Sequence, residues 1–125
     1  MGRENRFIGA LGEEKARELL KRKGYKIFAE NVRTRLGEID LVARHKGFIV
    51  FVEVKTRVTS SLGPPYISVT RAKQRHVVIC ALSYLRRYNL MDLKWRIDVV
   101  SVKLNYEYGV ENIEIIENAV EDDYV

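Results

Sequence analysis

Asp40, Glu53 and Lys55 have the residue types and the spacing of a small catalytic or metal-binding group. If Lys46 and Gly47 form a two-residue turn between two strands, the strands pair symmetrically about that turn. Asp40 then lies opposite Glu53, with Cβ atoms roughly 4.5–5.5 Å apart. Lys55 shares their face, because alternate residues of a strand point the same way. The spacing therefore predicts two carboxylates and an amine at the open end of one hairpin.

This arrangement has two interpretations. Two close carboxylates repel each other, and burying them is costly unless a positive charge lies between them. Lys55 can supply that charge, and so can a divalent cation. Oxygen ligands suit Mg²⁺ or Mn²⁺, and Mg²⁺ commonly takes one or two carboxylates together with waters and phosphate oxygens. The other interpretation is a solvated strand end, at which Glu38 faces Lys55 and forms a surface ion pair with it.

The rest of the hairpin is apolar on both faces. Nearer the turn, the face that carries Asp40 continues with Val42, Ile49 and Phe51. The opposite face is expected to hold Ile39, Leu41, Val50, Val52 and Val54. A strand pair that is buried on both faces is typical of a sheet covered by helices on each side.

The elements that must position this hairpin follow from periodicity and turn residues. The patterns predict a helix over 3–23, strands over 25–30, 37–43 and 48–55, a loop over 56–67, a helix from Ser68 or Thr70 to about Tyr88, and strands over 94–104 and 110–116. The order α-β-β-β-α-β-β predicts an α/β fold, with a mixed sheet flanked by helices.

The length and the charge distribution restrict the function further. A chain of 125 residues has room for one domain, which we expect to cover residues 1–125 and to end in an acidic stretch at about 117–125. All 22 Lys and Arg residues lie at or before Lys103, so residues 1–110 carry +11 and residues 111–125 carry −6. Such an excess of cations is typical of a nucleic-acid-binding protein, although a merely solvated surface would look the same.

Several classes of protein are excluded. No apolar run approaches the roughly 20 residues that cross a bilayer, and the basic start leads into no signal peptide, so we expect a cytoplasmic protein with no membrane partner. The single cysteine, Cys80, cannot form an internal disulfide or a cysteine metal cluster, and is expected in the core. Neither a zinc finger nor an aromatic RNA-binding signature is present.

The same residues carry a resemblance to a known family. The motifs are Gly37-Glu-Ile-Asp40, then after twelve residues Glu53-Val-Lys55-Thr-Arg57, with Gly9 to Ala16, Lys23-Gly-Tyr25, Asn31, Ala72-Lys73 and Arg96 to Val100. Over about residues 5–105, the chain resembles the YraN-like family of prokaryotic proteins. That family looks like part of the PD-(D/E)xK, restriction-endonuclease-like superfamily and is similar to archaeal Holliday junction resolvases. Here Ile39 stands where the superfamily's name has a proline.

The resemblance implies a role for each matching residue. Asp40 and Glu53 match the two metal-binding acids, to which the backbone carbonyl of Val54 is added, and Lys55 matches the catalytic lysine. Glu13 matches an acid that approaches the metal, and the alternative that it is an acid in the first turns of a helix with a favourable helix-dipole contact stays open. The implied reaction is Mg²⁺-dependent or Mn²⁺-dependent hydrolysis of a phosphodiester, in which the metal activates a water and Lys55 orients that water or offsets negative charge.

The resemblance also implies a substrate. We expect a structure-directed endonuclease that acts on branched or duplex DNA, in the manner of a Holliday junction resolvase, and that forms a homodimer by analogy with those enzymes. The cations near the site are expected to contact phosphates: Arg33, Arg35, Arg57, Arg71, Lys73 and Arg75. Glu38 is assigned a supporting role. Two alternatives stay open, namely a nuclease-fold protein that binds nucleic acid with little or no cleavage, and an RNA-directed nuclease.

Overall fold

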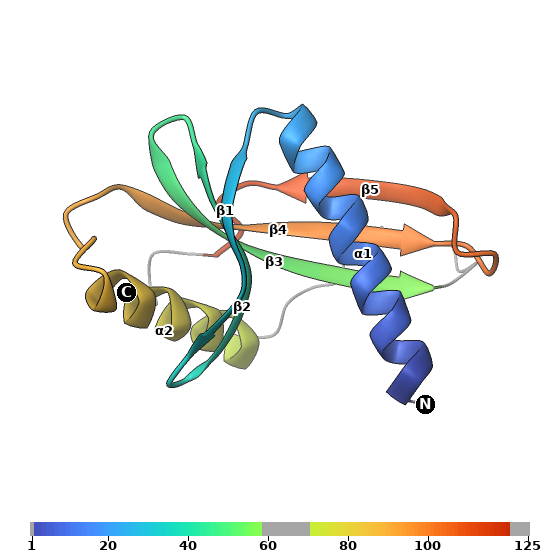
Figure 1. Cartoon of the computed structure of the whole chain (residues 1–125), viewed down its shortest axis with the longest axis horizontal. Helices are drawn as coiled ribbons and strands as arrows, with labels where there is room; N and C mark the ends of the chain where they lie inside the picture. The colour runs from blue at the N-terminus through green and yellow to red at the C-terminus, as the bar shows by residue number, and fades with distance from the viewer. Residues whose placement is uncertain (1, 59–70, 121–125) are drawn as a thin grey trace.

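The structure, a computed structural model, describes residues 2–58 and 71–120 of the chain. Its elements in chain order are α1 (Gly2–Arg22), β1 (Lys26–Thr34), β2 (Gly37–His45), β3 (Phe48–Val58), α2 (Arg71–Arg87), β4 (Trp95–Leu104) and β5 (Val110–Ile116), as Figure 1 shows. This is the element order that the sequence predicts. The expected helix start at Ser68 or Thr70, and residues 59–67 of the expected loop, lie outside the described residues.

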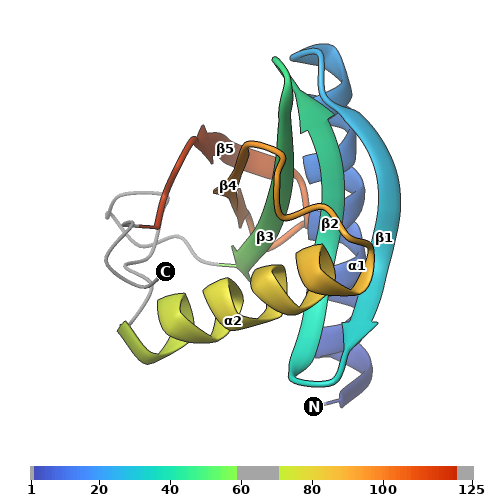
Figure 2. The same cartoon turned by 90° about the vertical axis from the view of Figure 1, so that its left-hand side faces the viewer.

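The five strands form one mixed sheet in the order β1-β2-β3-β4-β5. β3 and β4 are parallel and α2 connects them, whereas the other three neighbouring pairs are antiparallel. The two helices lie on opposite faces of the sheet (Figure 2). The predicted α/β fold with a mixed sheet flanked by helices is therefore confirmed.

The largest extensions beyond the sequence patterns are in β1 and β3; β2 is also longer than predicted, since it ends at His45 and not at Ala43. β1 continues to Thr34, because residues up to that point pair with β2, although its apolar alternation ends earlier. β3 continues to Val58, paired with Leu104 of β4, so the predicted loop begins three residues late. In both cases pairing with a neighbouring strand extends the element where the local pattern is weak.

The turn between β2 and β3 sets the register that the sequence predicts. Lys46 and Gly47 have φ angles of 52° and 84°, and two positive φ angles are what a type I′ hairpin turn requires. The pairs from His45–Phe48 to Leu41–Val52 follow symmetrically.

Each face of the sheet has its own hydrophobic core. One cluster joins β2 and β3 to α2 through Val42, Ile49, Phe51, Val78 and Leu85. The other joins the opposite face to α1 through Ala16, Leu20, Leu41, Val50 and Val52. One prediction here is wrong: Ile39 packs in the α2 cluster and not beside Leu41. Alternation fails there because β2 has left the β3 ladder beyond Leu41.

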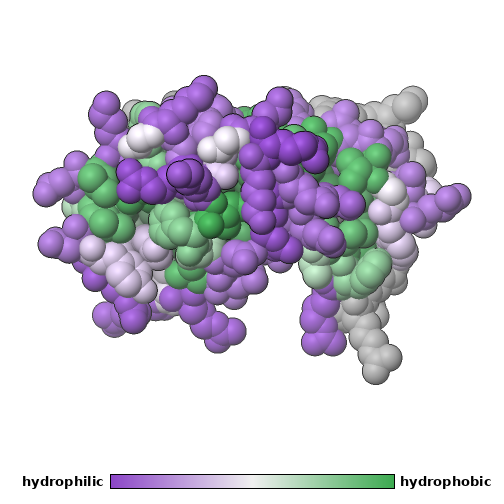
Figure 3. Space-filling model, turned by 45° about the horizontal axis from the view of Figure 1, so that its top comes forward, coloured by the Kyte–Doolittle hydropathy of each residue, from purple (hydrophilic) through white to green (hydrophobic). Residues whose placement is uncertain are grey.

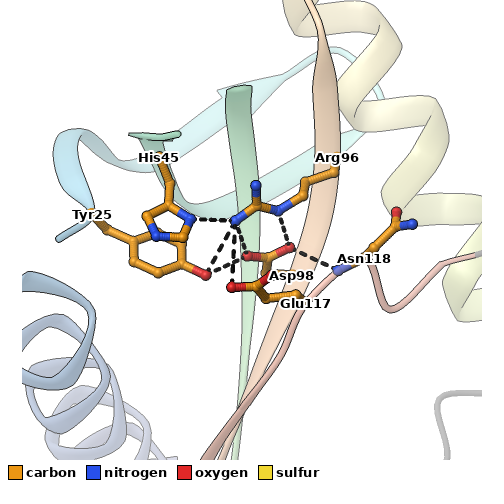
Figure 4. A network of polar contacts seen from close by, with 6 residues as sticks. All are labelled: Tyr25, His45, Arg96, Asp98, Glu117 and Asn118. Carbon is orange, nitrogen blue, oxygen red and sulfur yellow. Dashed lines mark hydrogen bonds and ion pairs between the residues drawn. The ribbon is translucent and has the colours of Figure 1, made fainter. Parts of the chain in front are cut away.

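A buried polar network joins Arg96 and Asp98, near the start of β4, to Tyr25, just before β1, and to His45 at the end of β2 (Figure 4). The Asp98 carboxylate is fully buried and accepts hydrogen bonds from the Tyr25 hydroxyl (2.7 Å) and from Arg96 Nε (2.9 Å). Arg96 Nη2 contacts His45 Nδ1 at 2.6 Å, and the His45 ring stacks on Tyr25. These contacts offset the cost of burying Asp98, as a buried charge requires.

The chain after β5 returns to this network. The Asn118 N–H donates to Asp98 Oδ1 (2.9 Å), and the Ala119 N–H donates to the Ile97 carbonyl (2.8 Å). Val120 is buried in the α2 cluster. The chain therefore stays attached to the sheet up to Val120, because Asn118 and Ala119 are held by backbone hydrogen bonds and Val120 by burial. Residues 121–125 lie outside the described part.

Hydrophilic side chains dominate the surface shown in Figure 3, where hydrophobic patches lie on either side of a hydrophilic band.

Cys80 is buried in the α2 core, as predicted. In the part of the chain that the structure describes, no helix is long and apolar enough to span a membrane.

Candidate active site

A pocket of about 440 Å³ opens where α1, β2, β3 and the first turn of α2 meet. Its polar lining consists of Glu13, Asp40, Lys55, Thr56 and Lys73. Five of the predicted site residues, from four different elements, therefore share one pocket, since Val54 lines it as well. Glu53 does not line it. The pocket is open to solvent on one side, so an extended ligand can reach it.

Asp40 holds its position through the backbone of β3. Its Oδ2 accepts a hydrogen bond from the Val54 N–H at 2.8 Å. The paired part of the hairpin ends at Leu41–Val52, one step before Asp40 and Glu53. The predicted cross-strand pair of Asp40 and Glu53 is therefore replaced by an Asp40–Val54 contact, in which a side-chain oxygen bonds the β3 backbone.

Lys55 is paired with Glu53. Its Nζ lies 3.2 Å from Glu53 Oε1, and both side chains are about four-fifths buried. Glu38 is opposite Arg33 in the β1–β2 ladder and is exposed, so the predicted facing pair of Glu38 and Lys55 is wrong. The reason is again that β2 and β3 part beyond Leu41.

Two acids of the site, Asp40 and Glu13, have raised pKa values. Burial, and then the negative charge of Glu53, raise the pKa of Asp40 from 3.8 to about 7, although the Val54 N–H opposes this. Burial also raises the pKa of Glu13, to which Glu38, Glu30 and Glu53 add. Groups whose pKa is shifted in this way cluster at functional sites. Burial thus disfavours the charged form of both acids that line the pocket.

The residues fit a divalent cation. Glu13 Oε1 is buried and has no hydrogen-bond partner among the described residues, which is costly for a carboxylate oxygen. A cation bound near Asp40 would provide the missing partner and reverse the rise in its pKa. No three His, Cys, Asp or Glu side chains of residues 2–58 and 71–120 form a ready-made cage. Mg²⁺ does not need one, since it keeps several waters beside one or two carboxylates.

Gly12 explains how α1 brings Glu13 to the sheet. A Cβ added at Gly12 would lie 1.8 Å from Thr56 Oγ1, so α1 packs directly against β3 at this point. Sequence analysis did not assign Gly12 or Thr56 to the site. The signal was present as Gly12 itself, because a glycine inside a helical pattern lowers helix stability and so indicates a packing reason for its small size.

We expect Gly12→Ala to destabilise the fold, although alanine favours helix by about 1 kcal/mol. The added methyl must displace Thr56, and overpacking of this kind costs about 1–3 kcal/mol. Gly9→Ala is the matched control, because its added Cβ meets nothing within 4 Å and should stabilise the helix. Urea unfolding of both variants measures the difference. Equal or greater stability of Gly12→Ala would contradict the close packing.

The predicted phosphate-binding cations fall into separate groups. Lys73 lines the pocket, and its contact with Lys55 lowers the pKa of Lys73. Arg57 lies near the end of β3 and is half-buried, and Arg75 is exposed on α2. Arg33 and Arg35 line a different groove, and the side chain of Arg71 lies outside the described part. Of the predicted cations, Lys73 therefore lies in the pocket, whereas Arg33 and Arg35 lie outside it.

The fold and the pocket define the class of protein: an α/β domain with a mixed five-stranded sheet and an acid–lysine pocket at one end of its central strands. The chain belongs to the uncharacterised protein family UPF0102, whose family profile matches residues 12–102. The prediction of the YraN-like family is thereby confirmed. The matched residues include every charged side chain of the pocket.

Relatives match over nearly the whole chain. A UPF0102 protein of Caldicellulosiruptor saccharolyticus is 43% identical over 114 residues, which cover 91% of this chain and 97% of the relative. A UPF0102 protein of Geobacter metallireducens is 43% identical over 121 residues, covering 97% and 98%. One of Pelobacter propionicus is 45% identical over 120 residues, covering 94% and 85%.

Proposed function

We propose that this protein is a metal-dependent endonuclease that hydrolyses phosphodiester bonds in DNA. The observation that carries the proposal is the unpartnered, buried oxygen of Glu13 in the same pocket as Asp40, whose pKa is raised to about 7. Acids in this state favour a cation, and the lysines beside them favour a phosphate. A metal and a phosphate bound side by side are what metal-assisted hydrolysis of a phosphodiester requires.

Asp40 and Glu13, which both line the pocket, are the carboxylates that would hold Mg²⁺ or Mn²⁺, together with the backbone carbonyl of Val54. Glu53 does not line the pocket and would act through its ion pair with Lys55. When bound, the ion supplies an activated water and neutralises charge on the phosphate. Asp40 stays aligned for this role through its hydrogen bond from the Val54 N–H. Because that donor belongs to the central strand β3, the carboxylate is held by the rigid part of the sheet.

Lys55 and Lys73 act on the substrate. Glu53 restrains the Lys55 ammonium at 3.2 Å, beside the pocket, where it can orient the attacking water or offset charge that develops in the transition state. Lys73 approaches from α2 and adds a second positive charge to the pocket. Two cations so close repel each other, and a bound phosphate would relieve that repulsion.

Branched DNA is the proposed substrate, because the motifs resemble those of the Holliday junction resolvases. The net charge of +11 on residues 1–110 supports binding to a polyanion. A homodimer would present two pockets to a two-fold symmetric junction.

The test is a cleavage assay with four matched substrates: a four-way DNA junction, duplex DNA, single-stranded DNA and RNA. Each is incubated with Mg²⁺, Mn²⁺ or EDTA. We expect cleavage of the junction with either metal and none in EDTA. Preferred cleavage of RNA would mean that RNA, and not branched DNA, is the substrate. Tight binding of all four nucleic acids without cleavage in either metal would mean that the protein binds nucleic acid without cleaving it.

The acidic end provides a further prediction. Glu121, Asp122 and Asp123 follow Val120, which is anchored in the core, and they oppose the charge of a phosphate chain. Truncation after Val120 should therefore raise DNA affinity severalfold at low ionic strength, where screening is weakest. Fluorescence anisotropy at two salt concentrations measures this. An affinity that does not change at low salt would show that these acids do not compete with DNA.

A further inference from the structure

A second groove lies between the end of the β1–β2 hairpin and the C-terminal half of α2. It consists of two adjoining hollows of about 480 Å³ and 600 Å³. Arg35, Ser83 and Arg86 line both hollows, which makes them one continuous groove. None of these three residues lines the pocket of Asp40.

The groove is strongly cationic. Arg33 and Arg35 line it from the hairpin, and Arg86 and Arg87 line it from α2. All four are exposed, and no Asp or Glu is among its lining residues. In residues 2–58 and 71–120, no acid forms an ion pair with any of the four; Glu38, which faces Arg33 across the ladder, also forms none with it. Four converging guanidinium groups without acids favour an anionic ligand.

An aromatic ring lies at one end of the groove. Tyr88 is about half exposed, and the Arg87 guanidinium lies 5.7 Å from the centre of its ring. Its inner neighbour Tyr84 is buried, at 4.7 Å between ring centres, and supports it from below. A positively charged groove with an exposed aromatic ring is the combination that binds single-stranded nucleic acid, with phosphates on the cations and a base on the ring.

We infer that this arginine groove binds the phosphate backbone of a nucleic-acid strand, and that Tyr88 stacks on an unpaired base of that strand. The inference rests on the proposed function, because it gives the same substrate a second contact. Along α2, Lys73 and Arg86 are about 20 Å apart. That distance corresponds to about six base pairs of duplex, so the bound strand extends well beyond the pocket.

The test compares two double variants that lose the same charge. Arg35→Ala/Arg86→Ala removes the two arginines shared by both hollows, and the control Arg22→Ala/Arg44→Ala removes two exposed arginines, at the end of α1 and at the far end of β2. Anisotropy with labelled single-stranded DNA in EDTA gives affinity without cleavage. We expect the groove variant to bind at least tenfold more weakly, with a salt slope reduced by about 1.4, and the control to change less than twofold.

Tyr88 separates stacking from charge. Tyr88→Ala should weaken binding to single-stranded DNA severalfold and leave the salt slope unchanged, whereas Tyr88→Phe should retain wild-type affinity. Binding to a blunt duplex should respond less to Tyr88→Ala, because the bases of a duplex are already stacked. Circular dichroism and thermal melting of every variant exclude unfolding as the cause.

Equal losses in the groove variant and its control would overturn the inference, since binding would then follow net charge alone. A change in oligomeric state of the groove variant on size-exclusion chromatography, with affinity unchanged, would also overturn it and would identify the groove as a protein interface. Because binding is measured in EDTA, these outcomes differ from failure of the proposed function, which is loss of metal-dependent cleavage with the groove contact intact.

Discussion

Asp40→Asn is expected to lower metal-dependent cleavage on the order of 10³-fold while leaving DNA affinity near or above that of the wild type. The asparagine keeps an oxygen that can accept the Val54 N–H, so the local structure should survive. It loses the charge that would hold the metal. Affinity need not fall, because one negative charge that repels phosphate has been removed. Single-turnover cleavage and anisotropy measure the two effects separately.

Lys55→Ala should cause a loss of similar size through a different step, because it removes the ammonium that Glu53 holds beside the pocket. Asp92→Asn and Lys94→Ala are the matched controls, since both residues are exposed and lie in the connection before β4. If Asp40→Asn and Lys55→Ala both cleaved like these controls, the measured activity would belong to another site or to a contaminant.

The second large effect concerns stability. In the folded protein the pKa of Asp40 is about 7, against an ordinary value of 3.8, so between these pH values the folded state retains a proton that the unfolded chain releases. The contribution of Asp40 to stability therefore falls as pH rises from about 4 to about 7 and stays low above that. Asp40→Asn, which carries no charge, should be more stable than the wild type by roughly 1–3 kcal/mol at pH 8.

At pH 4 the extra stability of Asp40→Asn over the wild type should vanish. Asp40 is then largely protonated in the folded state, so its burial destabilises the wild type little. Adding Mg²⁺ at pH 8 should raise the melting temperature of the wild type and not that of Asp40→Asn, since a ligand that binds only the folded state stabilises it. Melting curves at both pH values, with Asp92→Asn as the control, test this. If Mg²⁺ raised the melting temperature of Asp40→Asn as much as that of the wild type, Asp40 would not be a metal ligand.

Much of this protein follows from its sequence alone. The element order and the pairing of His45 with Phe48 and of Leu41 with Val52 were predictable, because a two-residue turn and a period of two residues are local properties. Family membership was predictable because the motifs around Asp40 and Lys55 are compact in sequence.

Only the tertiary structure decided how the site is assembled. β2 leaves β3 one step before Asp40, so the carboxylate reaches Val54, and α2 brings Lys73 to Lys55 across a long connection. The arginine groove is likewise assembled from segments distant in sequence, the end of β1 and the end of α2. Where paired strands part, and which helix residue faces which strand, depends on packing between segments distant in sequence. No periodicity or spacing within one segment contains that information.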